Sequence, residues 1–130
     1  MSKSAEYFEE KFSIESLGAA GGIVTGSLHK LRQGESTLVI DAGIFQGKND
    51  AFLPNGKSRN SEDLGNIKNV TDILLTHAHA DHVARLPLFY KKNWAPRTLT
   101  TEMTRELMEI ILKDSVKIQN NQDKLYTIEE

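Results

Sequence analysis

Residues 77–82 read His-Ala-His-Ala-Asp-His, so three of the four histidines of this chain and one aspartate fall within a single short segment. Imidazole nitrogens and carboxylate oxygens are the ligands that proteins offer to zinc, manganese and non-haem iron. A lone histidine more often bonds a loop carbonyl, and Asp81 could simply cap a helix. Four potential ligands in such close succession make a metal site the leading interpretation.

The spacing within the cluster is suited to two ions. His77 and His79 are two residues apart and can reach one ion, whereas Asp81 and His82 follow as a helix begins and can serve a second. Two divalent ions, zinc or alternatively manganese, can share a hydroxide formed at neutral pH and stabilise the charge that develops during hydrolysis. The cluster therefore predicts metal-assisted hydrolysis.

The composition is that of an ordinary globular domain, with 38% hydrophobic residues, 26% charged residues and a net charge of -2 over 130 residues. Lys and Arg form no long run, so composition alone does not indicate nucleic-acid binding. The chain has no cysteine, which excludes disulfides and thiolate zinc ligands. We find no signal peptide and no membrane span, so we expect a cytoplasmic location and no membrane partner.

The elements that position the cluster are predicted by hydrophobic patterning. Strands are expected at residues 12–17, 23–31 and 37–40, joined by turns at 18–22 and 33–36. They should form an antiparallel meander. We interpret His29 as a cross-strand histidine outside the site, and we do not propose Ser27 as a nucleophile.

The second half of the chain should alternate strands and helices. A polar loop is expected at residues 47–66, with a short helical turn at 62–67, and a buried strand at 71–76 presents the cluster at its carboxyl end. A helix at 82–92 and a strand at 97–100 should follow, with Trp94 packed under that helix. The last element is a long amphipathic helix at 101–120, capped by Thr101. Its apolar stripe is formed by Met103, Leu107, Ile110, Ile111 and Ile118.

Residues 76–82 match the H-x-H-x-D-H signature of the metallo-β-lactamase fold, and the surrounding chain resembles the β-CASP nucleases, the RNA-processing branch of that superfamily. The resemblance extends to residues 18–27, 41–47, 81–87 and 112–119. It implies an α/β fold of the αββα metallo-β-lactamase type. This chain would form the N-terminal half-sandwich, a mixed sheet with helices on one face.

The resemblance also assigns roles to residues. His77 and His79 would bind the first ion, Asp81 and His82 would bind the second, and Asp81 would also orient or deprotonate the nucleophilic water. Asp41 would lie below the site and orient the signature loop. Because Asp41 ends a predicted buried strand, a turn-capping role is its alternative.

Proteins of this family draw further metal ligands and an inserted cap from downstream segments. Residues 1–130 are therefore interpreted as the N-terminal portion of a metallo-β-lactamase-like domain, without the downstream half and any β-CASP cap. Half a sandwich would leave a sheet edge and an apolar face without partners. We therefore expect a homo-oligomer or a domain-swapped dimer.

For the parent protein we expect hydrolysis of phosphodiester bonds in RNA, or in DNA, with a metal-bridging hydroxide as nucleophile. The 130 residues alone are expected to be inactive. A second hypothesis is a hydrolase of the same fold that acts on a thioester, lactone or lactam, because a fold does not fix a function. A third is a non-catalytic truncated module that binds metal weakly or not at all.

Overall fold

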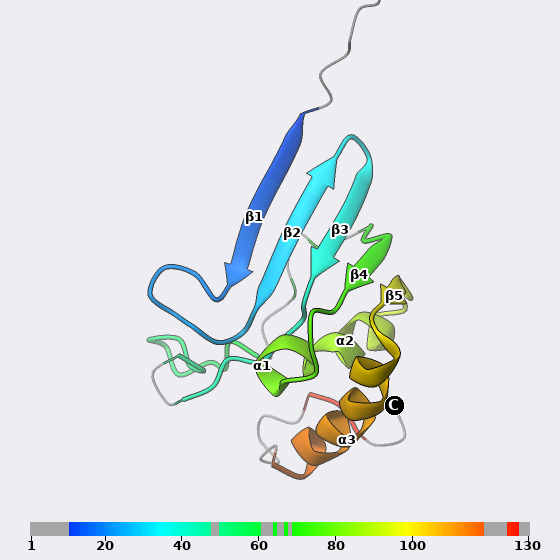
Figure 1. The fold of residues 1–130 in the computed structure, drawn as a ribbon. Coiled ribbons are helices and arrows are strands. Elements are labelled where there is room, and N and C mark those ends of the chain that lie inside the picture. The colour runs from blue at the N-terminus through cyan, green and yellow to red at the C-terminus, as the bar shows by residue number, and fades with distance from the viewer. Residues whose placement is uncertain are drawn as a thin grey trace, which may run out of the picture.

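The computed structural model describes residues 11–47, 50–60, 64, 67, 69–118 and 125–127. These residues form one five-stranded sheet, in which the strand order follows the chain, and three helices (Figure 1). The strands are β1 (Phe12–Gly18), β2 (Leu28–Gln33), β3 (Ser36–Ile40), β4 (Asp72–Leu74) and β5 (Arg97–Leu99). The first three strands are antiparallel, while β4 and β5 add in parallel to β3. The predicted antiparallel meander and the mixed α/β sheet are both confirmed.

Two short helices stand where the sequence predicts one at residues 82–92. They are α1 (Ala80–Val83) and α2 (Leu86–Lys91), and Pro87 lies in the first turn of α2. Proline has no amide hydrogen and its ring excludes the preceding turn of a helix, so a helix can begin at Pro87 but cannot run through it. The chain therefore ends α1 and starts α2 at this point.

Two strand predictions are corrected by the structure. The second strand begins at Leu28 rather than at residue 23, because residues 19–27 form a loop that contains Gly21, Gly22 and Gly26 at positive φ. Such backbone angles are easy for glycine and do not occur in an extended strand. The strand predicted at residues 71–76 is confined to β4. The helical turn predicted at residues 62–67 lies for the most part outside the described residues.

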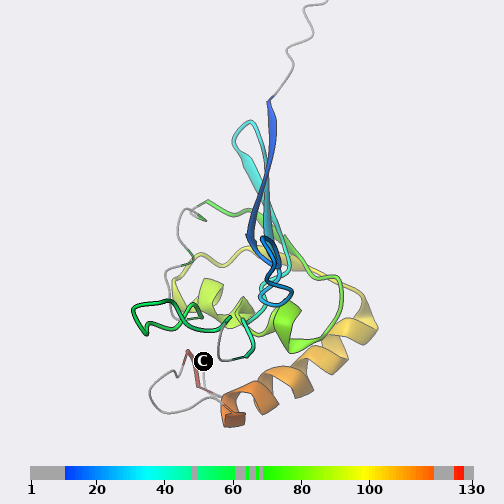
Figure 2. The same ribbon diagram turned by 90° about the vertical axis from the view of Figure 1, so that its left-hand side faces the viewer.

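Helices cover one face of the sheet. Val39 on β3 pairs with Ile73 on β4, and both side chains are completely buried in a core shared with residues of α1 and α2. The members that the two short helices contribute to this core are Val83, Leu86 and Phe89. Figure 2 shows that β1, β2 and β3 project beyond the helices. The covered face is therefore concentrated at the end of the sheet that carries α1 and α2.

The last helix, α3 (Glu102–Ile118), begins as predicted, but most of the stripe predicted to face the core is exposed. The backbone amide of Thr104 donates to Oγ1 of Thr101 at 3.2 Å, so the predicted N-cap is confirmed. Four residues of the predicted stripe are exposed by 50–73%: Met103, Leu107, Ile110 and Ile118. The residues that pack against the core are Met108, Leu112 and the fifth member of the predicted stripe, Ile111. Both sets have helical spacing, so periodicity alone could not choose between them.

Trp94 packs against the core beside Phe89, with ring centroids 5.8 Å apart, as the sequence predicts.

On the last two strands, Arg97 donates to the carboxylate of Asp72 at 2.6 Å, and this hydrogen bond lowers the pKa of Asp72. Among the described residues no helix is long and apolar enough to cross a membrane.

Candidate metal centre

The candidate site lies where β3 and β4 end. These two strands are parallel neighbours, so the segments that leave their carboxyl ends start from the same edge of the sheet. The backbone amide of Asp41, directly after β3, donates to the carbonyl of Leu74 at the end of β4 at 2.9 Å. This pairing brings Asp41 to the signature loop, although the two are far apart in the sequence.

Backbone hydrogen bonds at this edge hold together the residue 19–27 loop, the loop after β3 and the signature segment. The amide of Ser27 donates to the carbonyl of Asp81 at 2.9 Å, and the amide of Ala42 donates to the carbonyl of His82 at 2.7 Å. The approach is so close that a Cβ added to Gly43 would lie 1.5 Å from the carbonyl oxygen of Asp81. Only glycine fits there. The backbone of the signature segment is therefore packed against other backbone and is not a free loop.

A buried arginine, Arg85, further stabilises the loops that pack against the signature segment. The guanidinium of Arg85 donates to the carbonyls of Gly43 and Gly26, and it lies over the ring of Phe45 with 5.0 Å between the guanidinium carbon and the ring centroid. Burial lowers the pKa of Arg85 to about 10. The side chain still donates at neutral pH, and it ties the residue 19–27 loop and the loop after β3 to the start of α2.

The four signature residues lie next to one another in pairs. The ring centroid of His77 is 4.7 Å from that of His79 and 4.0 Å from that of His82. Nε2 of His82 is 3.5 Å from Oδ2 of Asp81. Within the described part of the chain, no three histidine or acidic side chains gather around one point closely enough to hold an ion. The residue before α1 is His79, so Asp81 lies in the first turn and does not cap this helix.

Asp41 is the buried centre of the hydrogen bonds beneath the signature. Its side chain is 3% exposed and its backbone has a φ of +61°. Nδ1 of His82 lies 2.8 Å from Oδ2 of Asp41, and the backbone amide of Thr76 donates to Oδ1 at 2.8 Å. The hydroxyl of Thr76 lies within 3.0 Å of both carboxylate oxygens. The Asp41 side chain therefore contacts the signature residue His82 and Thr76 directly before the signature, as its predicted orienting role requires.

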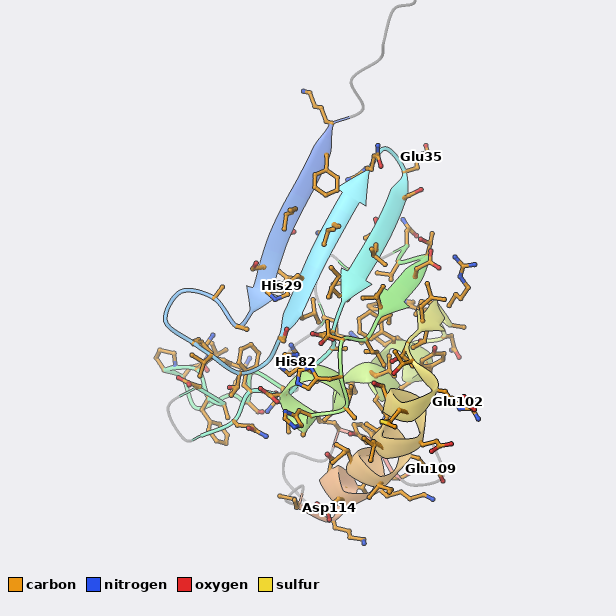
Figure 3. All side chains as sticks on the ribbon, viewed as in Figure 1. His29, Glu35, His82, Glu102, Glu109 and Asp114 are labelled. Atoms are coloured by element: carbon orange, nitrogen blue, oxygen red, sulfur yellow. The ribbon has the colours of Figure 1, made fainter. Side chains whose placement is uncertain are left out.

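Three polar residues near Asp41 were not assigned to the site from the sequence. They are Thr76, Ser27, whose hydroxyl lies 3.4 Å from Asp41, and His29, whose Nε2 lies 3.4 Å from that hydroxyl. His29 also bonds Ser16 on the neighbouring strand at 2.9 Å, so its predicted cross-strand position is confirmed. Figure 3 shows His29 and His82 at the same end of the sheet and Glu35 at the other. The proximity of Thr76, Ser27 and His29 to Asp41 becomes visible only once the strands are paired.

The donor atoms of the signature suit divalent ions. In both His77 and His82 the short hydrogen bond to Thr76 or Asp41 is made by Nδ1, so Nε2 is the nitrogen that faces away from it. Histidines that bind metals are commonly held by such a bond to the ring nitrogen remote from the ion. One carboxylate and three imidazoles, without thiolates, form a donor set typical of zinc and manganese.

Comparison with known families places this fold and site in one class. The family model described as the metallo-beta-lactamase superfamily matches residues 30–116, which include most of β2, the strands β3 to β5 and the whole signature. This chain belongs to the metallo-beta-lactamase superfamily. Membership implies divalent metal ions.

Individual relatives narrow the class to its RNA-processing branch. The chain is 41% identical to a ribonuclease of Thermus thermophilus over 98 residues, which are 75% of this chain and 21% of that protein. It is 44% identical over 130 residues to the transcription termination factor FttA of Pyrococcus abyssi, covering 95% of this chain and 20% of the relative. The endoribonuclease ysh1 of Schizosaccharomyces pombe is 31% identical over 137 residues, covering 97% and 17%. The resemblance to β-CASP nucleases is confirmed, and the chain spans about a fifth of the length of these relatives.

Proposed function

We propose that this chain is the signature-bearing part of a metal-dependent ribonuclease that hydrolyses phosphodiester bonds of RNA. One observation carries the proposal: the four signature side chains adjoin one another above the buried Asp41, in a chain whose relatives include proteins named as a ribonuclease and an endoribonuclease. The names of those relatives favour RNA over DNA. They also favour a nuclease over a thioester, lactone or lactam hydrolase.

In this proposal His77 and His79 hold one divalent ion and Asp81 and His82 hold a second, with zinc preferred and manganese as the alternative. When bound, such ions supply a hydroxide at neutral pH and stabilise the charge on the phosphate oxygens. Asp81 would orient the attacking water or accept its proton. Asp41 holds the ring of His82 in place through the bond to Nδ1.

We further propose that residues 1–130 correspond to the N-terminal portion of the catalytic domain. The relatives are about five times longer than the matched segment, and no three potential ligands converge among the described residues. Additional ligands would then come from other parts of the protein, and the 130 residues alone would bind metal weakly and cleave no RNA. The cytoplasmic location remains a prediction.

The test compares the product of the whole gene with its His77→Ala variant. Cleavage of a labelled single-stranded RNA should require zinc or manganese, and His77→Ala should reduce the rate by at least about a hundredfold, since even the partners of metal ligands typically contribute 10- to 100-fold. His29→Ala is the matched histidine control. His29→Ala should keep most of the cleavage rate, because His29 reaches Asp41 only through two contacts of 3.4 Å.

A chelator should abolish cleavage, and added zinc or manganese should restore it. RNA cleavage that survives both the chelator and His77→Ala would overturn the metal mechanism. Hydrolysis of a thioester or lactone without any cleavage of RNA would replace the proposed substrate by the small-molecule alternative.

A further inference from the structure

We propose that Thr76 is a positioning residue that fixes which ring nitrogen of His77 carries the proton. Thr76 directly precedes the signature, and its hydroxyl lies between Asp41 and the His77 ring. The inference deepens the proposed metal centre and rests on it, because a fixed tautomer matters only where the other ring nitrogen has a ligand to bind.

The Thr76 hydroxyl carries a single proton and can therefore donate only one hydrogen bond. Oγ1 lies 3.0 Å from Oδ1 and 2.9 Å from Oδ2 of Asp41, and it also lies 2.9 Å from Nδ1 of His77. A carboxylate only accepts hydrogen bonds, whereas a hydroxyl can donate one and accept others. The hydroxyl proton must therefore point to Asp41, since two oxygens would otherwise face each other without a proton between them. Nδ1 of His77 is then left as the donor to Oγ1.

His82 contacts the Asp41 carboxylate directly, without a hydroxyl between them. Its Nδ1 lies 2.8 Å from Oδ2 of Asp41, so Nδ1 of His82 is also the donor. One buried carboxylate thus sets the proton position in two signature histidines, in His82 by direct contact and in His77 through Thr76. In both rings the lone pair is placed on Nε2, the nitrogen available to a metal ion.

The sharpest test is nitrogen-15 NMR of labelled histidine in the metal-free 130-residue chain, which shows which ring nitrogen carries the proton. At about pH 8, where an ordinary histidine is neutral, His77 and His82 should both show a protonated Nδ1 and an unprotonated Nε2. Thr76→Val keeps the branched shape and removes the hydroxyl. His77 should then give averaged signals from both tautomers, while His82 should stay unchanged and serve as the internal control.

Two further variants separate positioning from general destabilisation. Thr76→Ser retains a hydroxyl and should restore the His77 pattern. Thr71→Val removes a similar hydroxyl at the start of β4, which bonds the carbonyl of Thr37 at 3.0 Å away from the site, and should leave both histidines unchanged. A structural role for Thr76 alone would alter stability without this selective change at His77.

Zinc titration of the same proteins distinguishes this inference from the proposed function. Thr76→Val should weaken zinc binding about tenfold, as loss of a partner of a metal ligand typically does, and Thr76→Ser should stay close to the unmodified chain. The predicted tautomers without any zinc binding would support the inference and contradict the weak metal binding proposed for the 130 residues. A proton on Nε2 of His77, or a His77 pattern that Thr76→Val does not change, would overturn the inference whether or not zinc binds.

Discussion

The two faces of the sheet are built from alternate residues of the same strands, yet only one is covered by the described helices. On the covered face Ile73 has no exposed surface, whereas its neighbour Leu74 on the other face is 38% exposed. The open face carries apolar residues as well. Its cross-strand row contains Ile14, Leu31 and Leu38, and Ile14 is 64% exposed.

This difference shows which side of the sheet stabilises the chain and which side is available for contacts. Apolar side chains in a close-packed interior gain both from removal from water and from dispersion contacts. A row of exposed apolar residues on an open sheet gains little of either, and it is a typical contact surface. The covered face should therefore dominate folding, and the open face should dominate association.

The largest effect is expected from truncation on the covered face. Ile73→Ala should lower the free energy of unfolding by about 3 kcal/mol, because the lost methyl and methylene groups leave a cavity in a close-packed core. Leu74→Ala, one residue along the same strand, should cost less than about 1 kcal/mol. Urea unfolding followed by circular dichroism measures both. Equal losses at the two positions would contradict the distinction between the faces.

An intermediate effect is expected on the open face. We predict that the 130-residue chain self-associates through this face or through the edge of β1, and that Ile14→Lys raises the dissociation constant at least about tenfold, since burial of one isoleucine contributes about 1.5–3 kcal/mol. Sedimentation equilibrium measures the change. Val24→Lys is the control, because Val24 is exposed in the residue 19–27 loop rather than on the sheet. A monomer at high concentration in the unmodified chain would refute the prediction.

The smallest effect is expected at the first turn of α3. This helix also has one side packed against the core and one side exposed. Thr101→Ala removes the hydroxyl that accepts from the amide of Thr104, and should cost about 1 kcal/mol. Hydrogen exchange of the first-turn amides of α3 should accelerate. Thr101→Ser should retain the cap and the protection. Unchanged exchange in Thr101→Ala would mean that packing of Met108, Ile111 and Leu112 alone holds the helix.

Local patterns predicted most of the fold. Alternation of apolar and polar residues indicated the three antiparallel strands, and the N-cap at Thr101 correctly marked the start of α3. The errors fell where one local pattern permits two structures. Residues 23–27 contain strand-forming side chains, but the glycines around them adopt positive φ and the segment becomes a loop. On α3 two apolar stripes compete, and the sequence does not show which of them meets the core.

The site was predictable to a similar degree. The signature itself, and by resemblance Asp41, could be named from the sequence. The signature residues as ligands and Asp41 as an orienting residue stay predictions. Thr76 could not be assigned, because a threonine at a strand end usually has only a structural role. Its position between Asp41 and His77 depends on the parallel pairing of β3 with β4, which no local pattern specifies.

The sequence by itself determined the chemistry on offer: imidazoles and carboxylates at fixed spacing, glycines where backbones can approach closely, and alternating apolar residues that favour a sheet. Those properties reside in single residues and their near neighbours. The tertiary structure decided which apolar face is covered, how Asp41 reaches the signature, and which ring nitrogen each hydrogen bond occupies. These outcomes depend on contacts between residues distant in the chain, because burial and hydrogen-bond direction are set by the groups that surround an atom in space.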